Sequence, residues 1–222
     1  MKKTSLLAAS SVAALGIGLL AGPAFAAEPS PTTYHADLAA LNHSGGSGTI
    51  TLSLSGRTAT VTEHVRGLAA TFDGQPYPHV QHIHVDAAHR CPTPSADTSS
   101  DGVISTTEGH PFYGDIGTTL TTSGDTSPAA ATTLTTAPSG SSFVYRRTVT
   151  LDDRTAASIR NGTAVVVVHG LDPSTLPPAA QDEPSDLVPS LPLAATSPTL
   201  CGPVTAAHSG HHGHHGHHGG RR

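Results

Sequence analysis

Short segments in which apolar and polar residues alternate predict a chain built mainly from β-strands. Residues 48–55 alternate cleanly, and the same pattern resumes over 59–65 after a turn at Gly56, so these two segments should form a hairpin. Further strands are expected at 79–87, 143–149 and 164–168. The pattern therefore indicates an all-β domain.

The segment 164–168 differs from the others because it is apolar at every position, with Ala164 followed by four valines. Such a run is typical of a central strand that is buried on both faces. One short helix is expected from Asp152 to Arg160, with Asp152 or its neighbour as the N-cap and Gly162 just past its end.

The first 26 residues have the features of a signal peptide. Two lysines precede an apolar run over 6–20, and a small-x-small cleavage motif follows at 24–26. An uncleaved anchor is the alternative. No later segment is long and apolar enough to cross a bilayer. We therefore expect a secreted chain that begins at Ala27.

Secretion changes the interpretation of the two cysteines, Cys91 and Cys201. In an oxidising compartment, two thiols far apart in the sequence most simply form one disulfide. Two free thiols are the alternative.

Composition and charge narrow the function classes. The formal net charge is −5, and it becomes −7 when the two signal-peptide lysines, the only lysines, are removed. Lysine-dependent catalysis is thereby excluded. An acidic chain without basic clusters also argues against binding of nucleic acid.

Two segments lie outside the strand pattern. Residues 171–198 are rich in Pro, Ser and Asp and predict a long loop, with several hydrophobic side chains as anchors. The anchors expected in this loop are Leu176, Leu187, Val188 and Leu191. Residues 205–222 interleave histidine with glycine and predict a disordered tail. Its imidazoles could bind copper, nickel or zinc, and a purification tag is the alternative. The folded domain should span 27–204.

Residues 97–108 match a calcium loop of the EF-hand type. Oxygen-bearing side chains occupy loop positions one, three, five and nine, with Gly102 at position six and Glu108 at position twelve. The expected ligands are Asp97, Ser99, Asp101, the Val103 carbonyl, Ser105 and Glu108. A plain acidic turn is the alternative. Prolines at 92 and 94 exclude a regular entering helix, so we expect a structural site with a Kd of about 10⁻⁴–10⁻³ M.

Histidines carry a second metal-binding pattern. On a strand, His82 and His84 point to the same face, and two such imidazoles can bind one copper or zinc ion. His169 ends the valine strand and would complete a set of three if the two strands are neighbours. The alternative is that these are polar side chains satisfied by their surroundings.

The order of these motifs resembles the copper/zinc superoxide dismutases. That family has a His-x-His copper pair, a cysteine soon after it, a late Val-Val-His and a terminal Cys-Gly. The stretch 81–85 also resembles the core of CHRD domains, and 108–114 resembles secreted bacterial CHRD-containing proteins. The resemblance covers roughly 34–204. It implies a Greek-key β-sandwich or barrel, with His82, His84 and His169 as copper ligands and Cys91–Cys201 as the matching disulfide.

The chain also departs from the dismutase pattern. Pro198 stands where that family has the arginine that attracts superoxide, and the zinc-loop pattern is missing, with only His89 and His110 in that region. We therefore expect a secreted, non-catalytic CHRD-like protein whose partners are metal ions: Ca²⁺ in the loop, and Cu or Zn at the histidines. The alternatives are a divergent copper-dependent superoxide dismutase and an extracellular Cu/Zn buffer that acts through the tail. The sequence does not identify a protein partner.

Overall fold

A computed structural model describes residues 30–207. The predicted signal peptide and the histidine-rich repeats from His208 onward lie outside the described residues. At the C-terminal end, residues 205–206 form a strand that pairs with the start of the first strand, so the ordered domain continues past the boundary expected at 204. None of the described helices is long and apolar enough to span a membrane.

One curled antiparallel sheet forms the body of the described chain, which confirms the all-β prediction. Its strands are β1 (Thr32–Ala40), β2 (Ser47–Ser55), β3 (Thr58–Arg66), β6 (Gln81–Val85), β7 (Asp115–Thr119), β8 (Ser142–Thr150), β9 (Val165–His169), β10 (Pro198–Pro203) and β11 (Thr205–Ala206). The order across the sheet is β7-β6-β9-β10-β1-β2-β3-β8, with β11 beside β1. A separate small hairpin joins β4 (Thr71–Phe72) to β5 (Gln75–Pro76).

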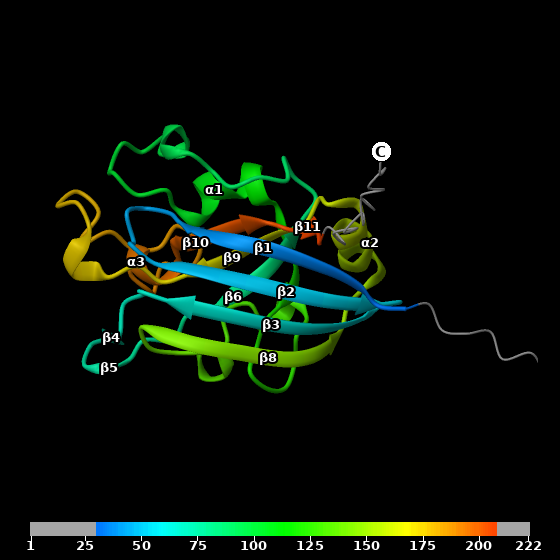
Figure 1. Ribbon diagram of the computed structural model, residues 1–222. Coiled ribbons are helices and arrows are strands. Elements are labelled where there is room, and N and C mark those ends of the chain that lie inside the picture. Colours follow the sequence, from blue (N-terminus) through cyan, green and yellow to red (C-terminus); the bar gives the residue numbers. More distant parts are fainter. Residues whose placement is uncertain (1–29, 208–222) are drawn as a thin grey trace, which may run out of the picture.

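The sheet folds over on itself into two layers. Figure 1 shows β1, β2, β3 and β8 in one layer, crossed behind by β10, β9 and β6. The two layers share β1, whose end pairs with β10 through Ala39 and Ala40. The inward-facing side chains of both layers fill one core, which includes Ile50, Leu52, Val61, Ile83, Val166, Val168 and Leu200. The result is a β-sandwich.

The predicted strands are present, with shifted ends. The hairpin of β2 and β3 closes across Ser55 and Thr58, so the turn falls where the glycine predicted it. The third expected strand, 79–87, is shorter than predicted. It ends at Val85 because Asp86 takes a left-handed backbone with φ of 64°, which an extended strand does not allow. The valine strand is buried on both faces, as expected.

Helices are few. α2 (Asp153–Asn161) begins as predicted, since the Asp152 carboxylate accepts a hydrogen bond from Thr155 N at 2.6 Å. Two further helices, α1 (Thr106–Tyr113) and α3 (Leu193–Thr196), were not expected. The remaining helical turns are η1 (Pro94–Ala96), η2 (Pro128–Ala130), η3 (Leu134–Thr136) and η4 (Pro173–Thr175).

The long segment 171–198 packs as a small second core and contains η4 and α3. Leu176 is buried in this core, but Leu187, expected as another anchor, is 52% exposed. The core also includes Val103, Leu171, Ala180, Leu193 and Ala194. The long segment therefore packs against the calcium-type loop and is not an extended, exposed loop.

Cys91 and Cys201 are joined in a disulfide, as predicted, with their Cα atoms 5.8 Å apart. Cys201 lies on β10 and is buried, whereas Cys91 lies in the connection between β6 and α1. The bond therefore anchors that connection to the outer face of the rear layer.

Candidate metal centre

Three histidines share the outer face of β6 and β9, which are neighbouring antiparallel strands. His82 stands opposite Val167, and His84 stands opposite Val165. His169 follows these valines at the same two-residue spacing, so its side chain is on the same face. The pairing of the two strands, which the sequence did not determine, is what brings His169 to the His-x-His pair.

One nitrogen of each imidazole is held by a backbone carbonyl. His82 Nε2 lies 3.1 Å from Ala131 O, His84 Nδ1 lies 2.7 Å from Gly114 O, and His169 Nδ1 lies 2.6 Å from Thr196 O. A carbonyl can only accept, so these nitrogens carry the protons. The contacts fix each tautomer and orient each ring, as commonly seen around metal-binding histidines.

The other nitrogen of each ring has no hydrogen-bond partner although it is buried. These atoms are His82 Nδ1, His84 Nε2 and His169 Nε2. One ligand nitrogen from each ring lies within 4.8 Å of the others, and within residues 30–207 no other group of three His, Cys, Asp or Glu side chains gathers so closely. Ligands of one ion at about 2.0–2.1 Å are up to about 4 Å apart, so the separation of these nitrogens is close to what one shared ion requires.

Burial keeps the three rings neutral. Their exposed fractions are only 3%, 3% and 4%. Burial lowers the pKa of His84 to about 3, with a further contribution from His169. Burial likewise lowers the pKa of His169 to about 4, and it places the pKa of His82 well below its usual range. The free nitrogens therefore offer lone pairs at neutral pH.

The end of helix α1 packs against one side of the His84 ring. The Tyr113 ring lies 4.6 Å from the His84 ring, and its hydroxyl donates to Thr106 O at 2.9 Å. Gly114 follows with φ of 91°, and a Cβ there would meet Val85 O at only 2.0 Å. Only glycine therefore lets its carbonyl approach His84 in this way.

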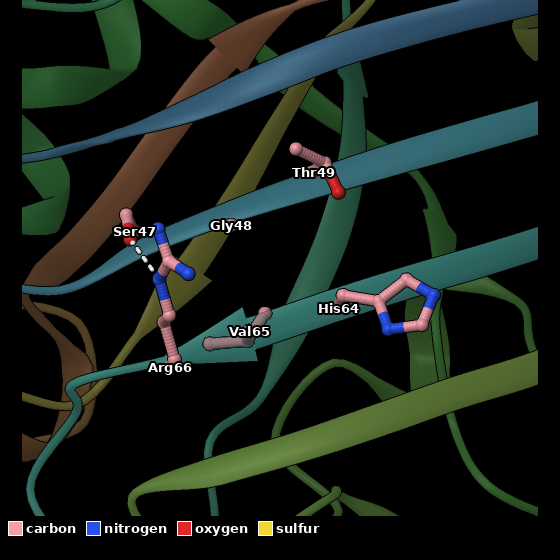
Figure 2. Close-up of a pocket in the computed structure, with 6 residues that line it drawn as sticks. All are labelled: Ser47, Gly48, Thr49, His64, Val65 and Arg66. Carbon is pink, nitrogen blue, oxygen red and sulfur yellow. Dashed lines mark hydrogen bonds between the residues drawn. The ribbon is translucent and has the colours of Figure 1, made fainter.

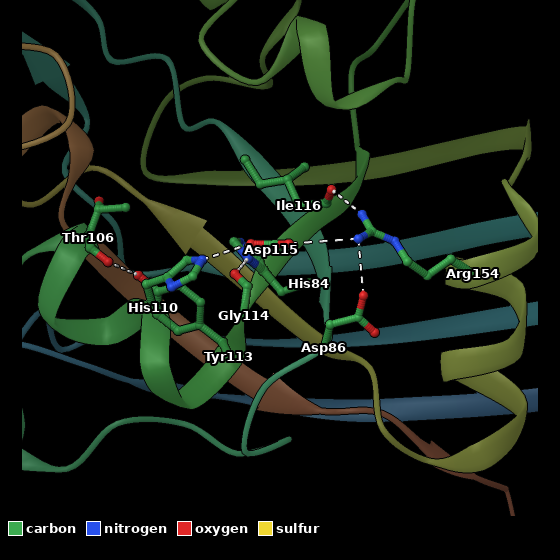
Figure 3. Close-up of polar contacts among 9 residues, drawn as sticks. All are labelled: His84, Asp86, Thr106, His110, Tyr113, Gly114, Asp115, Ile116 and Arg154. Carbon is green, nitrogen blue, oxygen red and sulfur yellow. Dashed lines mark hydrogen bonds and ion pairs between the residues drawn. The ribbon is translucent and has the colours of Figure 1, made fainter.

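Charged side chains lie near Tyr113 and Gly114 on the solvent side, as Figure 3 shows. His110 Nε2 lies 2.9 Å from Asp115 Oδ1. Arg154 on α2 contacts Asp86 at 3.0 Å and Asp115 at 3.7 Å, so it links the helix to the ends of β6 and β7. These exposed pairs position the strand ends near His84. His89, the other histidine noted in this region, is engaged with Thr163 O at 2.8 Å.

A fourth buried histidine, His79, was not singled out in the sequence. Its Nδ1 lies 2.9 Å from His169 O, and its Nε2 lies 3.0 Å from Ala69 O. It thus braces the end of β9 against the loop after β3. The sequence signal was weak because His79 lies outside the alternating part of its strand.

The acidic side chains of the calcium-type loop make hydrogen bonds within the loop. Within the described chain, Asp97, Asp101 and Glu108 are not a group whose carboxylate oxygens all lie within 4.8 Å of one another, although Ser99 Oγ lies 3.0 Å from Asp97 Oδ1 and 2.8 Å from Asp101 Oδ2. The carboxylates also accept hydrogen bonds from backbone N–H groups of the loop. Asp97 Oδ1 and Oδ2 accept from Ser100 N and Gly102 N, Asp101 Oδ1 accepts from Val103 N, and Glu108 Oε1 accepts from Thr98 N and Ser99 N.

Glu108 caps helix α1 in this arrangement. Its Oε2 accepts from Ser105 N at 3.0 Å, while Ser105 Oγ accepts from Glu108 N at 3.2 Å, which is a complete capping box. Partial burial alone would raise the pKa of Glu108. The hydrogen bonds from Ser105, Ser99 and Thr98 outweigh it and lower this pKa to about 2. A Ser-x-x-Glu pattern therefore satisfies a helix cap and a calcium loop equally well.

Replacing Glu108 by Ala should lower the free energy of unfolding by about 1–2 kcal/mol at pH 7 in the presence of chelator, because the cap is lost. A lowered carboxyl pKa means that this stability is present above about pH 4.5 and is lost as the pH falls towards 2. Urea unfolding at pH 7 and pH 3 measures it, with Glu183→Ala as the control. Equal stability of Glu108→Ala and the parent protein at pH 7 would contradict the capping role.

A hollow of about 200 Å³ lies on the opposite layer, on the outer face of β2 and β3 (Figure 2). It is lined by Ser47, Gly48, Thr49, His64, Val65 and Arg66. Arg66 Nε donates to Ser47 Oγ at 3.1 Å. The hollow is open and holds no group of acid, base and nucleophile, so the histidine centre is the stronger candidate site.

Comparison with known proteins gives a weak structural likeness. No protein-family model matches the chain, and no curated protein matches it. Among solved structures, superoxide dismutase 5 of Candida albicans in its Cu(II) form matches with 18% identity and a TM-score of 0.43, covering 82% of this chain and 95% of that one. A mutant of the same enzyme gives 17% identity and the same TM-score, covering 82% and 96%.

Proposed function

We propose that this protein is an exported metal-binding β-sandwich of the CHRD-like type that holds one copper or zinc ion at His82, His84 and His169 and does not turn over a substrate. The supporting observation is the set of three buried imidazole nitrogens without partners, each on a ring that a carbonyl orients. Neutral imidazole is a good ligand for both metals.

The chain's own residues explain what such a site would do. The carbonyls of Ala131, Gly114 and Thr196 keep one proton on each ring and direct the other nitrogen inward. Copper, when bound, would supply one-electron redox chemistry, whereas zinc would not. The rings are already neutral, so binding requires no loss of protons from them.

Burial is the reason to favour binding over catalysis. Each histidine is at most 4% exposed, and dismutation requires superoxide to reach the metal. Pro198 on β10 lies opposite His169 on β9, and a proline supplies no charge to attract an anion. A divergent superoxide dismutase remains the second candidate, since the order of His, Cys and Val-Val-His motifs resembles that family.

Export is supported by the Cys91–Cys201 disulfide, because such bonds persist in oxidising compartments.

The acidic loop at 97–108 remains a candidate for calcium only as a prediction from its residue pattern. Calcium at millimolar concentration should raise the melting temperature of the parent protein but not that of Glu108→Ala if the loop binds it. The histidine-rich tail is a separate candidate for metal capture.

Metal analysis after dialysis against Cu²⁺ or Zn²⁺ tests the proposed centre. The full chain should retain about one ion per chain more than His84→Ala, because loss of one of three ligands weakens the site. His64→Ala is the matched control, since His64 is an exposed strand histidine on the other layer. The tail is unchanged in all three proteins, so its contribution cancels.

Equal metal content in the full chain and His84→Ala would exclude the centre. A superoxide dismutase assay on the copper-loaded proteins separates the two candidate functions. We expect no activity above that of free copper. Activity that is present in the full chain and absent in His84→Ala would favour the dismutase.

A further inference from the structure

A polar cluster lies inside the sandwich, on the inner face of the strand that carries the histidine pair. Glu63 on β3, Gln81 on β6 and Tyr145 on β8 point into the hydrophobic core. Their exposed fractions are 0%, 1% and 3%. Glu63 has Tyr145 directly opposite on one side and the apolar Ile50 on the other.

The oxygens of this cluster are not satisfied. Both Glu63 oxygens, Gln81 Oε1 and the Tyr145 hydroxyl are buried without a hydrogen bond of regular geometry. The Gln81 amide nitrogen donates to Leu120 O at 3.4 Å. Burying an unpaired carboxylate costs far more than burying a neutral carboxylic acid, so this arrangement favours a protonated Glu63.

No basic side chain of the described chain forms an ion pair with Glu63. Arg147, also on β8, interacts with the side chain of Tyr145 and donates to Thr121 O at 2.8 Å, to Thr121 Oγ1 at 2.6 Å and to Gly124 O. Burial therefore raises the pKa of Glu63 to about 8, an effect that the Gln81 side chain only partly offsets.

The cluster and the histidine centre lie on opposite faces of one strand. Gln81 faces the core beside Glu63, and the next residue, His82, faces outward into the centre. A divalent ion among three neutral rings would bring two positive charges to the far side of a single buried sheet. Charges interact more strongly across a protein interior than across water, so such an ion would stabilise the ionised form of Glu63.

We propose that Glu63 is a proton-binding site coupled to the histidine centre, and that it releases its proton when a divalent ion binds to His82, His84 and His169. This inference rests on the proposed function. In the step, the Glu63 O–H bond breaks, its electron pair stays on the carboxylate, and the proton leaves for solvent. Binding thus adds one net positive charge to the protein instead of two.

Proton release on binding of Zn²⁺, which is redox-silent, tests the coupling. Calorimetric titration of the full chain at pH 7, in two buffers of different ionisation enthalpy, measures the number of protons released. The difference between the parent protein and His84→Ala isolates the centre from the tail. We expect this difference to be about one proton per ion, because Glu63 is mostly protonated before binding and the three rings release none.

The variant Glu63→Gln should bind the same number of Zn²⁺ ions and release about one proton fewer than the parent protein. Glu183→Gln, which alters a carboxyl outside the cluster, should release as many as the parent. Unchanged proton release in Glu63→Gln would overturn the coupling while leaving the metal centre intact. Identical zinc binding by the parent protein and His84→Ala would instead remove the proposed function, and the coupling with it.

A second measurement uses only the parent protein and so does not depend on whether a variant folds. The infrared difference spectrum of the parent protein with and without Zn²⁺ should lose the carbonyl stretch of a protonated carboxylic acid. It should gain the bands of a carboxylate. A spectrum in which zinc binds and the protonated acid persists would overturn the proposal even if Glu63→Gln failed to fold.

Discussion

Replacing both Cys91 and Cys201 by Ala should lower the free energy of unfolding by about 4–5 kcal/mol. The disulfide closes a segment with a sequence separation of 110 residues, and cross-linking so long a loop removes many conformations from the unfolded chain. The loss would be a large part of the stability of a typical domain. Urea unfolding followed by circular dichroism measures it from the midpoint and the slope.

Loss of the disulfide should also change the structure around Cys201, in addition to lowering the stability of the whole domain. Cys201 packs with Tyr113, Val165 and Val167 on the outer face of the rear layer, next to the histidines. Without the cross-link, the connection that leads to α1 loses its attachment to β10. We therefore expect the double variant to bind copper or zinc more weakly than the parent protein.

Reduction of the parent protein provides the control for this experiment. The reduced protein keeps both sulfur atoms, so it separates the loss of the cross-link from the loss of side-chain packing. Both forms should be destabilised by similar amounts. A loss below about 1 kcal/mol in the reduced protein would show that the disulfide contributes little, as happens when the unfolded state remains compact.

The second large effect is an increase in stability. Glu63→Gln should raise the free energy of unfolding of the metal-free protein by about 3 kcal/mol at pH 7. The folded-state pKa of Glu63 is raised from 4.5 to about 8. Between these values, folding requires the carboxyl to take up a proton that the unfolded chain has released. The parent protein therefore loses stability as the pH rises from about 4.5 to 8, by about 1.4 kcal/mol per pH unit.

Glutamine has no proton to lose, so the variant lacks this penalty. At pH 4 both folded and unfolded chains hold the proton, and the two proteins should then differ by less than about 1 kcal/mol. Urea unfolding at pH 4, 6, 7 and 8 tests the trend, and Glu183→Gln should follow the parent curve. A stability difference that did not change with pH would mean that Glu63 is ionised in the folded protein at neutral pH.

Several features of this protein follow from its sequence alone, because the signals that carry them are local. Alternation over 48–55 and 59–65 determines which side chains face the core, and Gly56 marks the turn between them. The same two-residue period places His82 and His84 on one face, and Asp152 caps its helix through a contact three residues away. Residue type and spacing decide such features before the chain has folded.

Strand pairing, in contrast, was decided by the tertiary structure. That β9 lies next to β6, and so brings His169 to the pair, depends on contacts between residues more than 80 positions apart. The inward position of Glu63 is visible in the alternation of its strand, but its lack of a partner depends on Gln81 and Tyr145 from other strands.

Residues 97–108 illustrate the remaining limit. Their oxygen donors suit a cation as well as they suit backbone N–H groups, and in the folded chain they accept hydrogen bonds from N–H groups of their own loop, so calcium binding stays a prediction from the residue pattern. A pattern of residue types defines what the side chains can bind. The tertiary structure adds the position of the loop in the fold, since Val103 packs in the second core and Ile104 N donates to Asn42 Oδ1 at 2.7 Å.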